Sequence, residues 1–179
     1  MKAARIHNFG GPEVIVVEEV AVPVPGSGEV LVKVAATGVG PWDALIREGK
    51  SKVAPQPPLT LGSDLSGVVE AVGLGVTEFK NSDQVYGVTN PQFCGANAEY
   101  AIAIATMIAL QPLGNTDIEA ASVPVVAVTE MADALRLCTR GAGSNCNDFG
   151  SRWERGRVRR AVRGESRTAC GRSGNKEGN

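Results

Sequence analysis

Aromatic side chains and metal-ligating residues are both scarce in this chain. Aromatic residues make up 4% of the 179 residues, and the only histidine is His7. The four cysteines include no Cys-x-x-Cys pair and stand at Cys94, Cys138, Cys146 and Cys170. Zinc sites take closely spaced thiolates or a thiolate–histidine set, so the sequence predicts no metal centre. The same spacing gives no support for a disulfide framework.

Long hydrophobic runs are also missing. Because no run of about 18 apolar residues occurs, we expect no transmembrane helix and no membrane partner. The first nine residues, MKAARIHNF, lack the apolar core of a signal peptide, so a cytoplasmic location is expected. The length fits one domain or slightly more, with a core of Val, Ile, Leu and Ala.

The net charge of −1 hides a difference between the two parts of the chain. Residues 1–129 contain 7 basic and 13 acidic residues, a net charge of −6, whereas residues 130–179 contain 11 and 6, a net charge of +5. A basic, Gly/Ser-rich tail is compatible with nucleic-acid binding or with plain disorder. Because no aromatic residues or repeats accompany the basic ones, we favour a disordered tail and expect no nucleic-acid partner.

Short apolar segments separated by Gly and Pro predict a mainly β fold over the first part of the chain. The expected strands cover residues 1–9, 14–22, 29–36, 65–72, 83–88 and 98–105. In residues 29–36, alternation places Val30, Val32 and Val34 on one face. Several short strands of this kind indicate a barrel or a sandwich extending to about residue 109.

Two short helices are expected within this β structure. Residues 41–49 begin with a proline, which suits a first helical turn, and end at a glycine. Residues 116–127 begin with Thr116 as a candidate N-cap, followed by Asp117 and Glu119, which favour the positive end of a helix. Pro124 lies inside this second segment and is expected to divide it.

Two glycine-rich turns organise the segment 37–69. Gly38-Val39-Gly40-Pro41 precedes the first helix, and Leu61-Gly62-Ser63-Asp64 precedes an apolar strand. With these turns, the chain resembles the GroES-like N-terminal domain of medium-chain dehydrogenases/reductases over residues 1–129. The resemblance implies a partly open β-barrel with short helices. It is greatest to the zinc-free quinone oxidoreductase branch of that family.

The positions that would bind zinc in the zinc-dependent branch differ here. That branch has a Cys after the first turn and a His-Glu pair after the Gly of the second, but this chain has Gly40 and then Ser63-Asp64. The four-cysteine lobe of that branch is reduced to a segment that holds only Cys94. The resemblance therefore implies a zinc-free protein.

The zinc-free branch carries out hydride transfer with NADPH, and the resemblance extends to its cleft residues. Its Asn-Pro-x-Asp motif is echoed here with Gly40 in place of the Asn and Asp43 as the acid. The resemblance implies cofactor-side positions at Gly40, Trp42, Asn90 and Thr129, and a catalytic or positioning role for Asp43. Asp43 also fits an ordinary first-turn helix acid, and Trp42 fits either a wall beside a flat substrate or a filler of the barrel edge.

The resemblance stops after Thr129, where the family would continue into a nucleotide-binding domain. Gly141-Ala142-Gly143 is a GxG without a preceding strand, so the sequence predicts no Rossmann domain. Reading one nucleotide over from the Glu130 codon permits an apolar strand, a Gly-rich turn and an amphipathic helix. We therefore expect a frameshifted, non-homologous tail over residues 130–179.

Two functional hypotheses follow. By resemblance, the chain derives from an NADPH-dependent oxidoreductase that reduces quinones or activated alkenes, forms a homodimer at full length, and is inactive as this short chain alone. Alternatively, it is a non-enzymatic truncated barrel or a self-association module. The coding DNA around codon 130 would separate a sequence lesion from a genuine short product.

Overall fold

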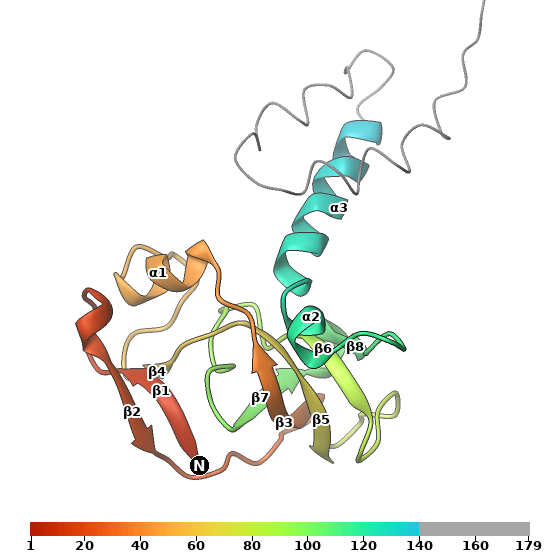
Figure 1. Cartoon of the computed structure of the whole chain (residues 1–179), viewed down its shortest axis with the longest axis horizontal. Helices are drawn as coiled ribbons and strands as arrows, with labels where there is room; N and C mark the ends of the chain where they lie inside the picture. Colours follow the sequence, from red (N-terminus) through yellow and green to blue (C-terminus); the bar gives the residue numbers. More distant parts are fainter. Residues whose placement is uncertain (140–179) are drawn as a thin grey trace, which may run out of the picture. The chain divides into compact units, whose positions relative to one another are not determined.

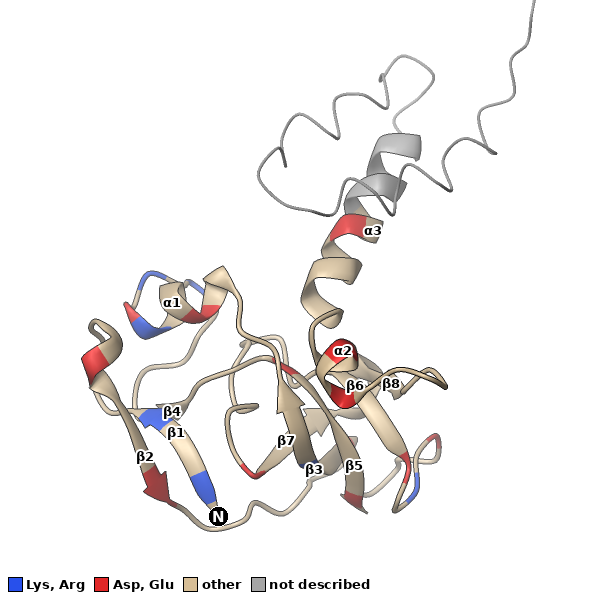
Figure 2. Cartoon of the chain, viewed as in Figure 1, with Lys and Arg blue, Asp and Glu red and all other residues tan. Residues whose placement is uncertain are grey.

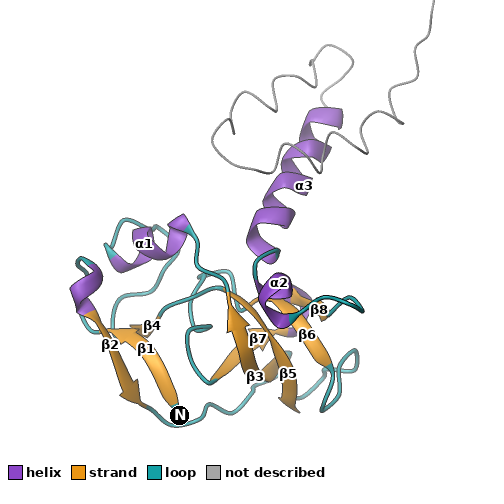
Figure 3. Ribbon diagram, in the orientation of Figure 1, coloured by secondary structure: helices purple, strands orange, loops and turns teal. Residues whose placement is uncertain are grey.

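The computed structural model describes residues 1–139, with side chains through Ala132. Strands dominate this part, with one short α-helix between β3 and β4 and two α-helices after the last strand (Figures 1 and 3). Of the tail expected over residues 130–179, residues 140–179 lie outside the described residues, and with them Cys146, Cys170 and the isolated GxG.

The first sheet has three antiparallel strands in the order β2-β1-β4. They are β1 (Lys2–Ile6), β2 (Ile15–Glu19) and β4 (Leu59–Thr60), and a 3-10 turn, Pro12–Val14, precedes β2. β2 forms one edge of this sheet, and the two-residue strand β4 forms the other.

The second sheet has five antiparallel strands in the order β7-β3-β5-β6-β8. They are β3 (Glu29–Thr37), β5 (Asp64–Val72), β6 (Gln84–Val88), β7 (Tyr100–Ile104) and β8 (Ile108–Leu110), with a 3-10 turn, Ala105–Met107, before β8. The two sheets do not close into a barrel. The mainly β, partly open fold with short helices is therefore confirmed.

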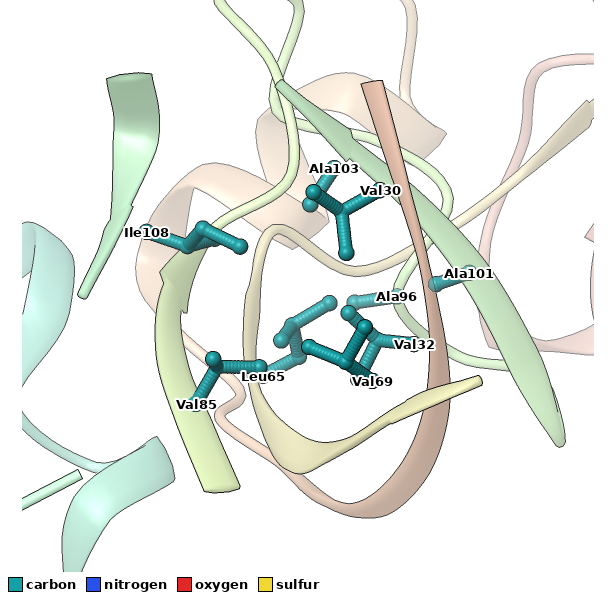
Figure 4. Packing of buried hydrophobic residues seen from close by; sticks show 9 residues of the cluster. All are labelled: Val30, Val32, Leu65, Val69, Val85, Ala96, Ala101, Ala103 and Ile108. Carbon is teal, nitrogen blue, oxygen red and sulfur yellow. The ribbon is translucent and has the colours of Figure 1, made fainter. Parts of the chain in front are cut away.

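A nine-residue apolar cluster fills the second sheet region (Figure 4). Its members come from five strands and from the loop before β7: Val30, Val32, Leu65, Val69, Val85, Ala96, Ala101, Ala103 and Ile108. No aromatic residue belongs to it, as the composition predicted. A second cluster of Ile6, Ile46, Leu59 and Leu61 seats helix α1 (Pro41–Arg47) on the first sheet.

Strict alternation of burial fails in β3. Leu31 is buried together with Val30 and Val32, whereas Val34 is only half-buried. The register of β3 against β5 shifts between Leu31 and Val32, and this irregularity breaks the period of two.

The expected helix over residues 116–127 is two helices. Thr116 caps α2 (Asp117–Ala121), because its hydroxyl accepts a hydrogen bond from the Glu119 amide. Pro124 begins α3 (Pro124–Thr139), at the first-turn position where its missing N–H is not needed. α3 continues through residues 130–139. Met131, Ala132 and Leu135 are good helix formers and account for this continuation.

The chain divides into two units, Met1–Glu130 and Met131–Asn179. The first unit contains all of the strands named above and the first turns of α3. Its acidic residues include Asp117 and Glu119 on α2 (Figure 2). Over the described residues, no helix is long and apolar enough to cross a membrane.

Candidate active site

The N-terminus of α1 is fixed by its own aspartate. The Gly40 amide donates a hydrogen bond to Asp43 Oδ2 at 2.7 Å, and Pro41 occupies the first helical position. Asp43 is 7% exposed, and among the described residues its Oδ1 has no hydrogen-bond partner. Burial raises the pKa of this carboxyl, and the neighbouring Asp64 adds to the rise, while the Gly40 and Gly62 amides oppose it. The geometry shows that Asp43 is the capping acid of α1.

Trp42 stands directly against Gly40. A Cβ atom built on residue 40 would lie 2.2 Å from Cζ2 and 2.4 Å from Cε2 of the indole. No side chain at residue 40 can coexist with the ring in this position. The Trp42 ring therefore fills the space that the Asn of the family motif would need at residue 40.

Ser63 and Asp64 form the junction of the site. Gly62, which precedes them, has a φ of +89°, a conformation that glycine adopts readily and other residues rarely do. Trp42 Nε1 donates to Ser63 Oγ at 2.8 Å, and Ser63 Oγ donates to Asp64 Oδ2 at 2.6 Å. The second carboxylate oxygen of Asp64 accepts from the Val125 amide in the first turn of α3 at 2.8 Å.

Burial and hydrogen bonding act on Asp64 in opposite directions. The residue is 3% exposed, and desolvation raises the pKa of its carboxyl. The Ser63 hydroxyl and the Val125 amide favour the charged form and lower the same pKa in part. Both polar partners point at the carboxylate, which therefore serves as the acceptor at the centre of this junction.

Among the described residues, the Asp64 carboxylate forms no ion pair with the basic side chains at the end of α1, Arg47 and Lys50. Arg47 donates to the Gly10 carbonyl and to Glu48, and Lys50 also pairs with Glu48. Since these three side chains belong to one helix end and the turn after it, their charges are neutralised locally. Asp64 instead holds the Val125 amide in the first turn of α3.

Thr129 lies one turn beyond Val125 on α3. Its side chain is exposed, and its hydroxyl donates to the Val125 carbonyl at 2.7 Å. The hydroxyl oxygen keeps its lone pairs free to accept another hydrogen bond. Val125 thus binds both side chains: its amide donates to Asp64, and its carbonyl accepts from Thr129.

Asn90 does not hydrogen-bond to this group. Its Nδ2 donates to the Cys94 carbonyl at 2.8 Å, and its Oδ1 accepts from the Gln92 amide at 3.0 Å. Asn90 and Cys94 line a separate open hollow of about 420 Å³ beside Arg5, Thr60 and Tyr100. Burial raises the pKa of the Cys94 thiol, which makes it a poor nucleophile.

Of the five residues predicted from the sequence, four are connected. Gly40, Trp42 and Asp43 lie at the start of α1, and Thr129 joins them through Val125, Asp64 and Ser63. The sequence analysis missed Ser63 as the link. Its position beside an aspartate in a glycine turn was visible, but its indole partner lies 21 residues earlier.

Within residues 1–139, no group of three or more His, Cys, Asp and Glu side chains could hold a metal ion. Ser63 and Asp64, which replace the family's His-Glu pair, are committed to the hydrogen bonds above. A hydroxyl that donates to a carboxylate is not available as a strong zinc ligand. The zinc-free character of the chain remains a prediction for elemental analysis.

Comparison with known proteins identifies the class. Residues 26–115 match the alcohol dehydrogenase GroES-like domain, and the chain belongs to that family. Within it, the similarity is to medium-chain enzymes of the quinone oxidoreductase type.

Three relatives illustrate this similarity. Quinone oxidoreductase of Sus scrofa is 43% identical over 113 residues, which cover 63% of this chain and 34% of the relative. The chloroplastic NADPH-dependent alkenal/one oxidoreductase of Arabidopsis thaliana is 34% identical over 137 residues, covering 72% and 36%. The structure of the quinone oxidoreductase from Coxiella burnetii superposes with a TM-score of 0.72 at 29% identity, covering 76% of this chain and 45% of that one. The chain thus spans about a third of the length of the curated relatives it matches.

Proposed function

We propose that this chain supplies the acceptor-side half of an NADPH-dependent oxidoreductase that reduces quinones or activated alkenes by hydride transfer. The observation that carries the proposal is the fixed indole of Trp42, held by Ser63 in a domain similar to quinone oxidoreductases. A half-buried aromatic face is a suitable wall for a flat, electron-poor acceptor.

The described residues fit the nicotinamide end of NADPH better than its phosphates. Thr129 offers an exposed hydroxyl, and Trp42 offers an aromatic face. Pyrophosphate is normally held by a glycine-rich turn between a parallel strand and the N-terminus of a helix. The glycine turn before α1 differs, because it follows the antiparallel strand β3 and its Gly40 amide is occupied by the Asp43 carboxylate. When bound, NADPH supplies the hydride, and the residues of this chain position the acceptor and exclude water from it.

Asp43 enters the proposal as a positioning residue. Its carboxylate holds the Gly40 amide and so fixes the turn from which Trp42 projects. Asn90 has a smaller part, since both ends of its amide are used within its own loop.

The test is quinone-dependent oxidation of NADPH, measured on the chain as it stands and on the chain with its reading frame restored after Thr129 and extended to full length. The short chain should bind NADPH weakly and show no turnover, because the phosphate-binding elements are lacking from its described part. The restored chain should be active, and Trp42→Ala in that chain should raise the KM for the acceptor more than it lowers kcat. A folded but inactive restored chain would refute the reductase assignment.

The second candidate, a self-association module, is favoured by one feature of the first sheet. Edge strand β2 exposes three consecutive apolar residues, Ile15, Val16 and Val17, with Val17 70% exposed. Unpaired apolar edge strands can add to another sheet. Sedimentation of the chain with Val17→Lys as the matched variant distinguishes the two candidates. Loss of a dimer in the variant would support self-association, and a monomer in both would remove this alternative.

A further inference from the structure

A chain of hydrogen bonds joins two helices that are far apart in the sequence. It runs from Trp42 Nε1 on α1 to Ser63 Oγ, then to Asp64 Oδ2, and from Asp64 Oδ1 to the Val125 amide on α3. The three donor–acceptor distances are 2.8, 2.6 and 2.8 Å. Ser63 is fully buried and Asp64 nearly so, which protects the middle of the chain from water.

With Asp64 ionised, the chemistry of these groups permits only one direction for the hydrogen bonds. An indole N–H and a backbone amide only donate, an ionised carboxylate only accepts, and a serine hydroxyl does both. Ser63 must therefore accept from Trp42 and give its own proton to Asp64. A short O–H···O⁻ bond of this kind is charge-assisted and stronger than a neutral one. With every group satisfied, a change at one end alters the hydrogen bonding at the other.

We propose that Asp64 is a positioning residue that couples the seating of α3 to the orientation of the Trp42 indole through Ser63. The indole has a single polar atom, and Ser63 is its partner, so this bond fixes the ring angle against rotation at the mouth of the turn. α3 carries Thr129 one turn after the amide that Asp64 binds. The Asp64 carboxylate thereby positions both groups that face the candidate site, the Trp42 ring and the Thr129 hydroxyl.

This inference rests on the proposed function only for calling Trp42 a wall of the acceptor site. The occupant of that wall would be a flat conjugated carbonyl compound, which can stack on an indole face. The coupling itself concerns groups of this chain and can be measured without any ligand. A failure of ligand binding would therefore count against the proposed function but not against the coupling. A failure of the coupling would not count against the proposed function.

The experiment follows the Trp42 indole N–H by two-dimensional ¹H–¹⁵N NMR of the full chain. Trp153→Phe in all samples leaves one indole signal. In Ser63→Ala that signal should move upfield, and its exchange with water should quicken several-fold to about tenfold, as expected for loss of one hydrogen bond. In Asp64→Asn the signal should also move, because an amide replaces the charged acceptor of the Ser63 proton.

Ser66→Ala is the matched control. Ser66 is equally buried, but its hydroxyl donates to the Asp117 carbonyl and holds α2 instead. It should lower stability to a similar extent and leave the Trp42 indole signal in place. An indole signal that moves equally in Ser66→Ala would show general loosening and would overturn the specific link.

The reciprocal measurement is made at α3. Trp42→Phe removes the indole N–H while keeping an aromatic ring, and exchange of the Val125 amide should then quicken several-fold. This variant also serves if Ser63→Ala does not fold. An unchanged Val125 amide in Trp42→Phe, or an unmoved indole signal in Asp64→Asn, would overturn the coupling.

Discussion

The indole of Trp42 occupies the space that a side chain on residue 40 would need. A Cβ there would come within 2.2 Å of the ring, so Gly40 and Trp42 form a matched pair. Neither residue can be understood from the family motif alone, which has Asn at the first position. In this chain the indole fills the space beside the turn and finds its polar partner in Ser63.

The first prediction tests this pair with Gly40→Asn. Asn is a preferred N-cap residue, so any loss of stability reports the clash with the ring and not a poorer cap. We expect the free energy of unfolding to fall by about 1–3 kcal/mol, as for overpacking of a filled site. Urea denaturation gives this value.

Two further variants sharpen that test. Gly40→Asn combined with Trp42→Ala should lose less than the sum of the single losses, because the small residue makes room. Gly26→Asn is the control, since Gly26 is outside the left-handed region and only the flexible Glu29 carboxylate lies within 4 Å of its Cβ position. Strict additivity of the two changes at residues 40 and 42 would contradict the matched pair.

The second prediction concerns the pH dependence that Asp43 brings. Because burial raises the pKa of its carboxyl, the folded chain holds this proton more tightly than the unfolded chain. The contribution of Asp43 to stability is therefore greatest below about pH 4 and falls as the pH rises through the folded-state pKa. Asp43→Asn lacks this fall, so its stability relative to the wild type should improve between pH 4 and pH 7.

Asp43→Ala separates the charge from the cap. Both variants lack the titrating carboxyl, but only Asn keeps an acceptor for the Gly40 amide, so Asp43→Ala should be less stable than Asp43→Asn by about 1 kcal/mol at both pH values. Thermal unfolding at the two pH values measures both variants. If Asp43→Asn instead loses stability relative to wild type as the pH rises, then the carboxylate is stabilised in the fold, and our account of Asp43 is wrong.

The third prediction concerns the start of α2. Thr116 and Glu119 cap each other, with the Glu119 amide donating to the Thr116 hydroxyl and the Thr116 amide donating to the Glu119 carboxylate. Thr116→Ala should lower the free energy of unfolding by about 0.5–2 kcal/mol. Ser122→Ala, at the other end of the same helix, should have a smaller effect, and chemical denaturation of both variants decides the matter. Equal losses would show that the cap has no special role.

Much of the fold could be predicted because local rules determine it. Alternation in residues 29–36 and the apolar run of residues 65–72 identified β3 and β5, and Pro41 and Thr116 marked the starts of α1 and α2. β4 and β8 were missed, since two or three residues carry no measurable period. Their pairing comes from long-range contacts.

The site was predicted less completely than the fold. The family resemblance implied site roles for Trp42, Asp43 and Thr129, and these roles remain predictions. Trp42 and Thr129 are positioned through Ser63, Asp64 and Val125, which form a hydrogen-bonded link across distant parts of the sequence. Asp64 accepts its hydrogen bond from the amide of Val125, which lies 61 residues later in the sequence, and no local pattern predicts that bond. Asn90 shows the opposite case, because both ends of its amide bind within its own loop.

The most direct test of the account is a titration of the ¹⁵N-labelled full chain with a fully substituted, water-soluble benzoquinone, which does not add to thiols. We predict saturable shifts of the Trp42 indole N–H and of the Gly40 and Thr129 amides, with Tyr100 beside the separate hollow unchanged. NADPH alone should bind weakly. Absence of any shift at Trp42 under saturating quinone, or shifts centred on Tyr100 instead, would contradict the assignment of this surface as the acceptor-side half of a reductase.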